Sequence, residues 1–255
     1  MPNCVGAVDG THLPYATENL AYHNCKKFKS LNMQAIVNPN GMFCDLFDQC
    51  PIPGSWSDKR VYDWSDARHW VKNISKMSVK MISGMPVGFY IVADGGYGQL
   101  SRPGLQVPYV PADTTWKKRY NFHHSSARMI VEQAFGALKG RWRILLVTHI
   151  HKYAPDAIVE LFVACAVLHN LLLIDGDRVA RRDIVPHGEG CRWEVLNYAD
   201  AAAVAAPPLS ELDQGVAERV AIARHVIETH YGDDPMATIV HPIEYDAGMG
   251  PDDDE

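Results

Sequence analysis

The sequence predicts an α/β fold, in which helices flank a mixed central sheet, and three observations support this class. Apolar runs of strand length occupy residues 4–9, 32–38, 42–48 and 87–94. A stripe of apolar residues with helical spacing follows at 131–145. The order of three strands, a helix, a strand and further helices is typical of α/β proteins, whose layers pack around one core.

The predicted strands carry acids and turns at their ends. The first strand ends in Asp9 and Gly10, and the fourth ends in Asp94 followed by a glycine-rich turn. An acid followed by glycine is most often simply a turn. Residues 38–41, Asn-Pro-Asn-Gly, form a favourable hairpin turn between the second and third strands. Ser57 is a suitable N-cap for a helix that we expect to continue to about residue 72.

The central helix is the most regular element of the sequence. Ser125 or Ser126 is a suitable N-cap, and five apolar side chains recur at spacings of three and four: Val131, Phe135, Leu138, Trp142 and Leu145. The neighbouring face carries Arg128, Glu132, Gly136, Lys139 and Arg143. One carboxylate among cations suits a site where phosphate approaches a metal ligand. Alternatively, Arg128 and Glu132 form an ordinary i, i+4 ion pair on a solvated face.

The rest of the chain predicts a less regular C-terminal part. A loop with prolines spans about residues 100–120, a short strand is expected at 144–150, and a mostly apolar, buried helix at 155–173. Beyond residue 174 the pattern weakens into a linker, a helix at 211–231 and an acidic end. We therefore expect an organised domain over residues 1–175 and a C-terminal extension over residues 176–255.

The composition is that of a globular protein, with 47% hydrophobic and 21% charged residues. No run of about 18 apolar residues occurs, so we expect no membrane span and no membrane partner. The six cysteines are scattered without a C-x-x-C pair, which argues against a zinc ribbon or a disulfide framework. We expect the cysteines to be small buried hydrophobic residues.

The net charge of −6 is unevenly distributed along the chain. Residues 116–152 contain eight Lys and Arg and one acid, whereas residues 200–255 contain thirteen acids and two arginines. A basic segment in an acidic chain suggests a local polyanion site. The acidic end either stays solvated or shields that site.

Three carboxylates are positioned so that they could converge. Asp9 and Asp94 end strands, Glu132 comes from the central helix, and ligands of open α/β sheets gather at the carboxyl ends of strands. Converging carboxylates repel one another unless a cation joins them, and oxygen ligands favour Mg²⁺ or Mn²⁺. Two such ions roughly 3.5–4 Å apart activate a water and stabilise the leaving oxygen when a phosphodiester is cleaved.

Three motifs resemble the DDE endonuclease domain of PIF/Harbinger-type transposases. They are Val8-Asp9-Gly-Thr-His12, Ala93-Asp94-Gly-Gly-Tyr97 and Arg128-x3-Glu132-x2-Phe-Gly-x-Leu-Lys139, with further matches at Pro53-Gly54-Ser55 with Asp58, at His124-Ser125 and at Leu168-His-Asn170. The resemblance covers about residues 3–173. It implies an RNase H-like fold and a DNA endonuclease or transposase whose catalytic, metal-binding triad is Asp9, Asp94 and Glu132, with Mg²⁺ or Mn²⁺ as cofactor. It also implies a nuclear location and a separate Myb-like DNA-binding partner protein.

The cations near this triad are expected to bind DNA phosphates. They are Arg128, Lys139, Arg143, Lys117 and Lys118, together with His124, which either meets DNA or makes a structural bond. Phosphate contacts position DNA without reading its sequence, so we expect binding without sequence preference. His12 and His169 are expected to make structural hydrogen bonds.

Two other functions remain open. Val8-Asp9-Gly-Thr11 resembles the end of the D-x-D-G-T motif of haloacid-dehalogenase-type phosphatases, but Ala7 stands where their nucleophilic Asp would be. The other is a domesticated transposase that acts only in DNA or protein binding. The family's members usually carry a helical DNA-binding region before the first Asp, and eight residues precede Asp9. The three acids together favour the nuclease.

Overall fold

The computed structural model describes residues 1–98, 101–146, 153–177 and 213–231. Its centre is a five-stranded sheet in the order β3-β2-β1-β6-β7. β1 (Cys4–Pro14) pairs antiparallel with β2 (Ser30–Val37), which pairs antiparallel with β3 (Phe43–Leu46). On its other side β1 runs parallel to β6 (Tyr90–Val92), which runs parallel to β7 (Leu105–Gln106). The predicted α/β class with a mixed sheet is confirmed.

Two turns shape the strands outside this parallel part. The predicted turn between β2 and β3 is confirmed, because Gly41 N donates to Asn38 O at 2.9 Å and Gly41 has the φ of 82° that glycine adopts readily. A separate hairpin pairs β4 (Lys80–Ile82) with β5 (Met85–Val87). The predicted fourth strand, 87–94, is thus divided between the end of β5 and β6.

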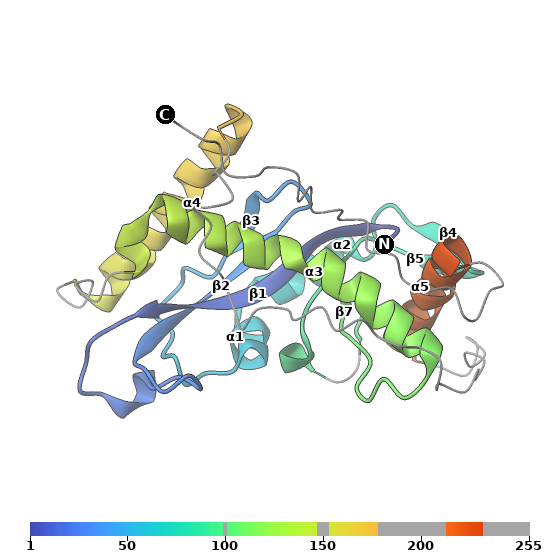
Figure 1. Cartoon of the computed structure of the whole chain (residues 1–255), viewed down its shortest axis with the longest axis horizontal. Helices are drawn as coiled ribbons and strands as arrows, with labels where there is room; N and C mark the ends of the chain where they lie inside the picture. The colour runs from blue at the N-terminus through green and yellow to red at the C-terminus, as the bar shows by residue number, and fades with distance from the viewer. Residues whose placement is uncertain (99–100, 147–152, 178–212, 232–255) are drawn as a thin grey trace, which may run out of the picture.

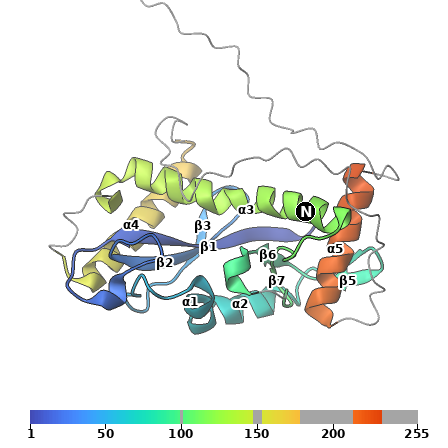
Figure 2. The ribbon, with the colours of Figure 1, turned by 60° about the horizontal axis from the view of Figure 1, so that its bottom comes forward.

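Helices cover both faces of the sheet, as Figure 2 shows. α3 (Thr115–Arg141) and α4 (Pro155–Ile174) pack on one face, and α1 (Asp58–Trp64) and α2 (Ala67–Ile74) pack on the other. Ala7 belongs to the first core and its neighbour Val8 to the second, because successive side chains of a strand point to opposite faces. The runs of apolar residues in the sequence therefore reflect strands that are buried on both sides.

The central helix α3 begins earlier than predicted. It starts at Thr115, so Ser125 and Ser126 lie within the helix instead of capping it. The segment before Ser125 looks polar in sequence, but Tyr120 is fully buried and extends the core beneath it. The predicted apolar stripe is confirmed for Val131, Phe135, Leu138 and Leu145, which are fully buried, whereas Trp142 is the C-cap of α3 and only partly buried.

The helix predicted to run from Ser57 to about residue 72 is two short helices. Ser57 caps α1 as predicted, with its side chain accepting from Arg60 N. α1 ends at Trp64, and Ser65 Oγ then donates to the Tyr62 carbonyl at 2.9 Å. A serine that bonds to the preceding turn competes with the helical ladder, and α2 starts anew at Ala67.

α4 confirms the predicted helix at 155–173 but is buried on one side only. Ile158, Phe162 and Ala166 lie in the core, whereas the opposite side exposes Val167, Leu168, Leu171 and Ile174. Among the described helices, α4 alone is long and apolar enough to cross a membrane, with a mean hydropathy of 2.3. The sequence shows no uninterrupted apolar run of this length, because polar residues such as Glu160, His169 and Asn170 interrupt the helix. Its inner side belongs to the core, as in a core helix with one exposed apolar side.

α5 (Gln214–Tyr231) comes from the predicted C-terminal extension, yet it packs against the N-terminal part of α3, as Figure 1 shows. Ile222, Ala223 and Val226 join the same apolar core as α3. The buried Arg219 donates to the carbonyl groups of residues 107 and 108, at 3.3 and 3.2 Å. The predicted division at residue 175 therefore does not separate α5 from the core.

Three smaller expectations are corrected. The predicted loop at 100–120 contains β7 and the first turn of α3. The strand predicted at 144–150 begins as a 3-10 helix, Arg143–Leu146, and its remainder lies outside the described residues, as do the linker and the acidic end. Of the five cysteines described, Cys165 is buried, but Cys25 and Cys44 are exposed, so the expectation of uniformly buried cysteines was wrong.

Candidate metal centre

Three carboxylates lie together where β6 ends. Oxygen atoms of Asp9, Asp58 and Asp94 lie within 4.8 Å of one another. The parallel register pairs Ala7 with Val92, so Asp9 and Asp94, each two residues further on, come to the same level. Asp58 is the first residue of α1 and joins them from the next layer. The structure thus brings Asp9 and Asp94 together, as the sequence predicted, and adds Asp58.

Asp9 and Gly10 lie within a strand, not in a turn. β1 continues to Pro14 and is paired with β2 over this length, with Asp9 opposite Ala35 and Gly10 opposite Gln34. A Cβ atom on Gly10 would lie 2.3 Å from Asp58 Oδ1. Glycine is required here by space, because the Asp58 carboxylate packs directly over the strand.

Asn32 on β2 holds the Asp58 carboxylate in this place. Its Nδ2 donates to Asp58 Oδ1 at 3.3 Å and to the Trp56 carbonyl at 3.1 Å. Its Oδ1 is buried and has no hydrogen-bond partner within the described part of the chain. That oxygen lies 3.1 Å from the point where a Gly10 Cβ would stand, which places an unpaired acceptor beside the cluster.

Burial makes the negative charge of this cluster costly. It raises the pKa of Asp9 to about 7, because desolvation and the nearby Asp94 together outweigh the attraction of Arg128. Burial likewise raises the pKa of Asp58, opposed by its hydrogen bond from Asn32 and reinforced by Asp94. Two of the three carboxyl groups, Asp9 and Asp58, are therefore harder to ionise than usual when no cation is present.

Glu132 lies outside the group of three and reaches it through Arg128. Arg128 Nη1 donates to Asp9 Oδ2 at 3.1 Å, and Arg128 Nη2 pairs with Glu132 Oε1 at 2.5 Å. The predicted i, i+4 ion pair is confirmed, and its guanidinium also bridges the helix to the strand. Arg128 was expected to meet DNA; in the structure its charge is already shared by two carboxylates.

The donor set suits a hard divalent cation. Within the described residues, the cluster consists of carboxylates and contains no His or Cys, the ligands that zinc prefers. The unpaired Asn32 Oδ1 is a further oxygen donor beside it. A divalent cation would also offset the desolvation and the repulsion by Asp94 that raise the pKa of Asp9 and Asp58. Mg²⁺ or Mn²⁺ therefore fits these residues.

Lys139 corrects the expectation of a solvated cationic face. Its side chain is buried, and Nζ donates to Thr11 Oγ1 at 2.6 Å and to the His12 carbonyl at 3.0 Å. Burial lowers the pKa of this amine to about 8. The helical spacing identified the correct face of α3, but that face is covered by β1, so Lys139 joins α3 to the strand and does not meet solvent.

His124 is likewise structural. It is 2% exposed, and Nε2 lies 3.1 Å from the Gln106 carbonyl on β7. Burial lowers its pKa to about 4, so the neutral ring donates this bond. His12 and His169 make the structural bonds predicted for them, to Ser30 Oγ at 3.0 Å and to the Gly41 carbonyl at 3.2 Å.

The remaining predicted phosphate contacts lie at the two ends of α3. Lys117 pairs with Asp113 at 2.6 Å in the first turn, and Lys118 lies half-buried beside it. Arg143 is exposed just beyond the C-cap. The cations expected to bind DNA phosphates are therefore dispersed, and none of these three contacts the carboxylate cluster in the described part of the structure.

Asp58 is the functional candidate that sequence reasoning missed. In the sequence Asp58 follows Pro53-Gly54-Ser55 and the Ser57 N-cap, but no spacing links it to Asp9 or Asp94. Only the packing of α1 over Gly10 makes that link.

Comparison with known proteins adds a family to this geometry. The profile of one family, described as DDE superfamily endonuclease, matches residues 8–170, a range that includes all three cluster acids and Glu132. No solved structure matches the chain significantly.

Three relatives illustrate the similarity. "Protein ALP1-like" of Arabidopsis thaliana is 29% identical over 184 residues, 68% of this chain and 44% of the relative. "Putative nuclease HARBI1" is 29% identical over 210 residues in Rattus norvegicus, covering 77% of this chain and 55% of the relative. The protein of that name in Homo sapiens is 28% identical over 180 residues, 69% and 48% respectively. The chain spans about half the length of the curated relatives it matches.

Proposed function

The chain belongs to the DDE superfamily endonuclease family, and from that premise we propose that it is a divalent-metal-dependent nuclease that hydrolyses phosphodiester bonds in DNA. The resemblance to PIF/Harbinger-type transposases is confirmed by this membership and by the relatives. We also propose an RNase H-like fold, which the family suggests and with which the order β3-β2-β1-β6-β7 agrees.

One observation carries the proposal: the oxygen atoms of Asp9, Asp58 and Asp94 lie within 4.8 Å of one another. They come from β1, α1 and the end of β6, which are far apart in the sequence, so only the fold brings these acids together. Because holding carboxylates so close without a cation is costly, the arrangement favours metal binding.

Each residue of the site has a distinct proposed role. Asp9 and Asp94 would hold Mg²⁺ or Mn²⁺ with Asp58 as the third ligand, and Asp58 is an addition to the ligands that the sequence predicts. Bound divalent ions supply an activated water and neutralise charge on the leaving 3′ oxygen. Asn32 orients Asp58, and the hydrogen bond that Gly96 N donates to Asp94 Oδ1 at 2.8 Å fixes the start of the segment after β6.

Arg128 gives Glu132 an indirect role. Its guanidinium occupies Asp9 Oδ2 and Glu132 Oε1, so a cation that binds Asp9 must compete with it. A cation that displaces Arg128 from Asp9 would leave Glu132 available beside the cluster. Glu132 thus belongs to the proposed catalytic triad with Asp9 and Asp94, and Arg128 keeps its charge balanced when no metal is bound.

The test is nicking of supercoiled plasmid by the whole chain with Mn²⁺, compared with EDTA. Asp94→Asn keeps the oxygen that caps Gly96 but loses the charge, so nicking should fall roughly 100-fold or more while the fold is retained. Asp58→Asn should show a comparable loss if Asp58 is a ligand. Asp45→Asn, a half-buried acid on β3 outside the cluster, is the matched control and should nick normally. Full activity of Asp94→Asn would refute the site.

A second candidate is a domesticated, non-catalytic derivative that only binds DNA or protein. The observation that favours it is Arg128, which already neutralises Asp9 and Glu132. Metal-independent DNA binding without any nicking by the unaltered chain would support this candidate. The phosphatase alternative is not proposed, because Ala7, at the nucleophile's place, is fully buried in the core.

We further propose a nuclear location and a Myb-like DNA-binding partner, both implied by the family resemblance. The partner would supply the sequence readout that phosphate contacts alone do not. Co-purification of the tagged chain from nuclear extract, followed by identification of the bound proteins, tests both together. Recovery of the chain outside the nucleus, with no DNA-binding protein attached, would count against them.

A further inference from the structure

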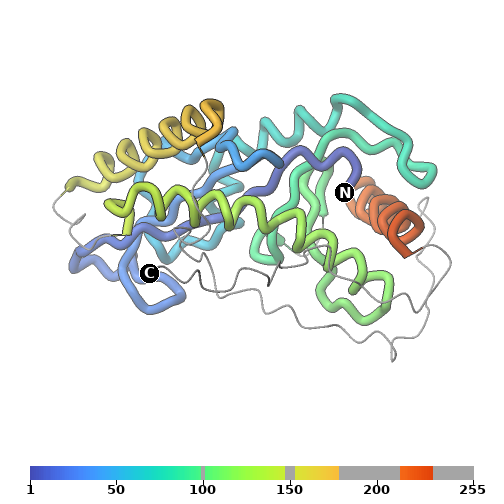
Figure 3. The backbone as a smooth tube through the Cα atoms, turned by 45° about the horizontal axis from the view of Figure 1, so that its top comes forward, coloured from blue at the N-terminus to red at the C-terminus, as the bar shows by residue number. Residues whose placement is uncertain are grey.

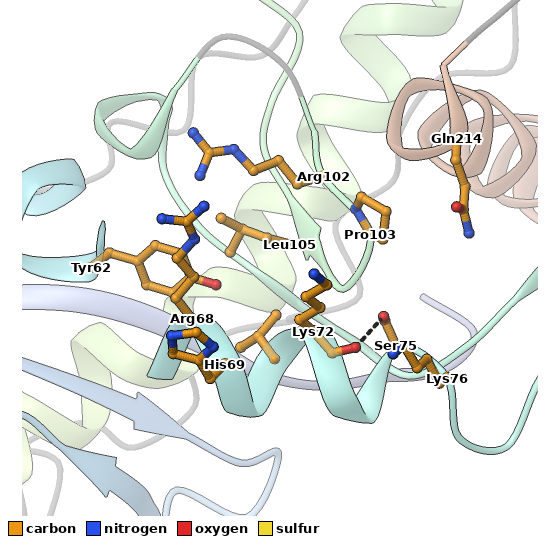
Figure 4. Close-up of a pocket in the computed structure, with 11 residues that line it drawn as sticks. Tyr62, Arg68, His69, Lys72, Ser75, Lys76, Arg102, Pro103, Leu105 and Gln214 are labelled. Atoms are coloured by element: carbon orange, nitrogen blue, oxygen red, sulfur yellow. Dashed lines mark hydrogen bonds between the residues drawn. The ribbon is translucent and has the colours of Figure 1, made fainter. Parts of the chain in front are cut away.

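A second polar feature of the molecule is a groove between α2 and the segment that leads into β7. It has a volume of about 550 Å³, and Tyr62, Val71 and Leu105 form part of its wall. Figure 4 shows the side chains of Arg68, His69, Lys72, Lys76 and Arg102 around its opening, with Gln214 of α5 at one end. No residue that lines the groove is acidic.

The groove gathers positive charge without neutralising it. Arg68, Lys72 and Lys76 follow one another at intervals of four, so α2 and the turn after it present them on one side. All three are exposed, and within the described residues none of them forms an ion pair. Arg102 is the exception, with Nη1 3.1 Å from Asp63 Oδ1.

Such a row is unfavourable for the isolated helix. Like charges at i, i+4 destabilise a helix by a few tenths of a kcal/mol, which applies to Arg68 and Lys72 within α2, and Lys76 follows just beyond the helix end. An anionic partner would reverse that effect. Eight residues of helix rise about 12 Å, which matches about three nucleotide steps of a DNA strand at ~3.4 Å per step along the axis.

The groove begins beside the carboxylate cluster. Asp58 starts α1, and Tyr62 lies one turn further along the same helix, about 6 Å away along its axis. Tyr62 lines the groove and packs edge-on against Tyr97, with ring centroids 5.8 Å apart, and Tyr97 lies three residues after Asp94. α1 and the 3-10 helix Gly95–Tyr97 therefore connect the two sites.

We propose that this groove, and not the face of α3 that carries Lys139, binds the phosphate backbone of the DNA strand next to the bond that is cut. The inference rests on the proposed nuclease function. Arg68, Lys72 and Lys76 contact phosphates spread over about three nucleotide steps of this strand, and Arg102 ties the segment before β7 to α1 through Asp63. The apolar floor adds contact for sugars without reading base edges, so the groove contributes affinity without sequence preference.

The test measures binding of a fluorescent duplex of random sequence by anisotropy, in EDTA, between 50 and 200 mM KCl. All proteins carry Asp94→Asn, so that no cleavage occurs. Lys72→Ala with Lys76→Ala should lower the slope of log affinity against log salt by about 1.8, at ~0.9 per phosphate contact. Across this salt range the unaltered groove should therefore lose about 12-fold more affinity than the variant.

Two controls keep the result specific. Lys72→Arg with Lys76→Arg retains both charges and should keep the original slope. Lys26→Ala with Lys27→Ala removes two exposed lysines from the β1–β2 connection, which lies at the opposite end of the molecule from α5 in Figure 3, and should leave the slope nearly unchanged. Both lysines of the groove are exposed, so circular dichroism and melting should show that the alanine variant folds normally.

The outcomes separate this proposal from the nuclease proposal. An unchanged slope in the alanine variant, or an equal loss in the Lys26 and Lys27 control, would overturn the groove even if the chain with Asp94 intact nicks plasmid. The expected slopes without any Mn²⁺-dependent nicking would support the groove and count against the nuclease. Equal competition by poly-glutamate of the same total charge would overturn the DNA assignment in favour of an acidic protein segment.

Discussion

Gly10→Ala is the substitution that most directly tests the geometry of the metal centre. The added Cβ would lie 2.3 Å from Asp58 Oδ1, whereas ordinary van der Waals contact begins at 3.4 Å. The carboxylate must therefore move by roughly 1 Å. Metal–ligand distances vary by only about 0.2 Å, and Mg²⁺ requires nearly ideal geometry, so this displacement should remove Asp58 from the coordination sphere.

The expected loss falls on metal affinity and hardly on the fold. Loss of one positioned ligand should raise the Kd for Mn²⁺ about 10- to 100-fold. At a fixed, saturating Mn²⁺ concentration this removes about 1.4–2.7 kcal/mol of metal-dependent stabilisation. Without metal the variant should unfold within about 1 kcal/mol of the original protein, because Ala is favoured over Gly in a strand and Asp58 can turn aside.

The assay is calorimetric titration with Mn²⁺, combined with melting curves with and without the metal. Asp58→Ala is the comparator, and it should show the same loss. Because Gly10→Ala acts through Asp58, the double variant should lose no more than either single variant. Unchanged Mn²⁺ affinity in Gly10→Ala would refute the idea that Asp58 is a ligand held in place by the missing Cβ. Additive losses would show that the substitution acts elsewhere.

Three further predictions concern residues that the structure places in the interior. Burial lowers the pKa of Lys139 from 10.5 to about 8, so the unfolded chain binds more protons than the folded protein between these pH values. As pH rises through this range, the free energy of unfolding should increase by up to about 3 kcal/mol relative to that of Lys139→Met, as measured by urea unfolding. Burial lowers the pKa of His124 from 6.5 to about 4, so the free energy of unfolding should fall by up to about 3 kcal/mol as pH drops from 6.5 to 4. Urea unfolding of the original protein and of His124→Gln at several pH values should show this dependence only in the original protein. Phe135→Ala should cost about 3–5 kcal/mol in the same assay, and Trp142→Ala clearly less, because Phe135 is fully buried and Trp142 is not; equal costs would contradict the assigned burial.

The sequence determined the elements whose signal is local. Strands buried on both faces appear as apolar runs, and the turn at residues 38–41 and the cap at Ser57 rest on neighbouring residues alone. The first three residues of the stripe, Val131, Phe135 and Leu138, identified the inner face of α3, since helical periodicity shows which side chains share a side. The resemblance in the motifs around Asp9, Asp94 and Glu132 was also readable from the residues, and it identified the family.

Tertiary structure decided what depends on neighbours distant in sequence. The start of α3 at Thr115 depends on burial of Tyr120, and the short strand β7 exists only because β6 offers an edge. The same holds for α5, whose place against α3 cannot be inferred from a weak helical pattern after a long linker. In each case long-range packing outweighs local propensity.

The functional site shows the same division. The sequence supplied Asp9 and Asp94 because each follows an apolar run that predicts a buried strand, and the parallel pairing of β1 with β6 brings the two acids to the same level. It could not supply Asp58, which joins them because Gly10 leaves space for a helix from another layer, nor the burial of Lys139 and His124 beneath β1 and β7. Periodicity shows which residues share a face of a helix. Whether that face meets solvent, substrate or another strand depends on the elements packed against it, and only the tertiary structure decides these.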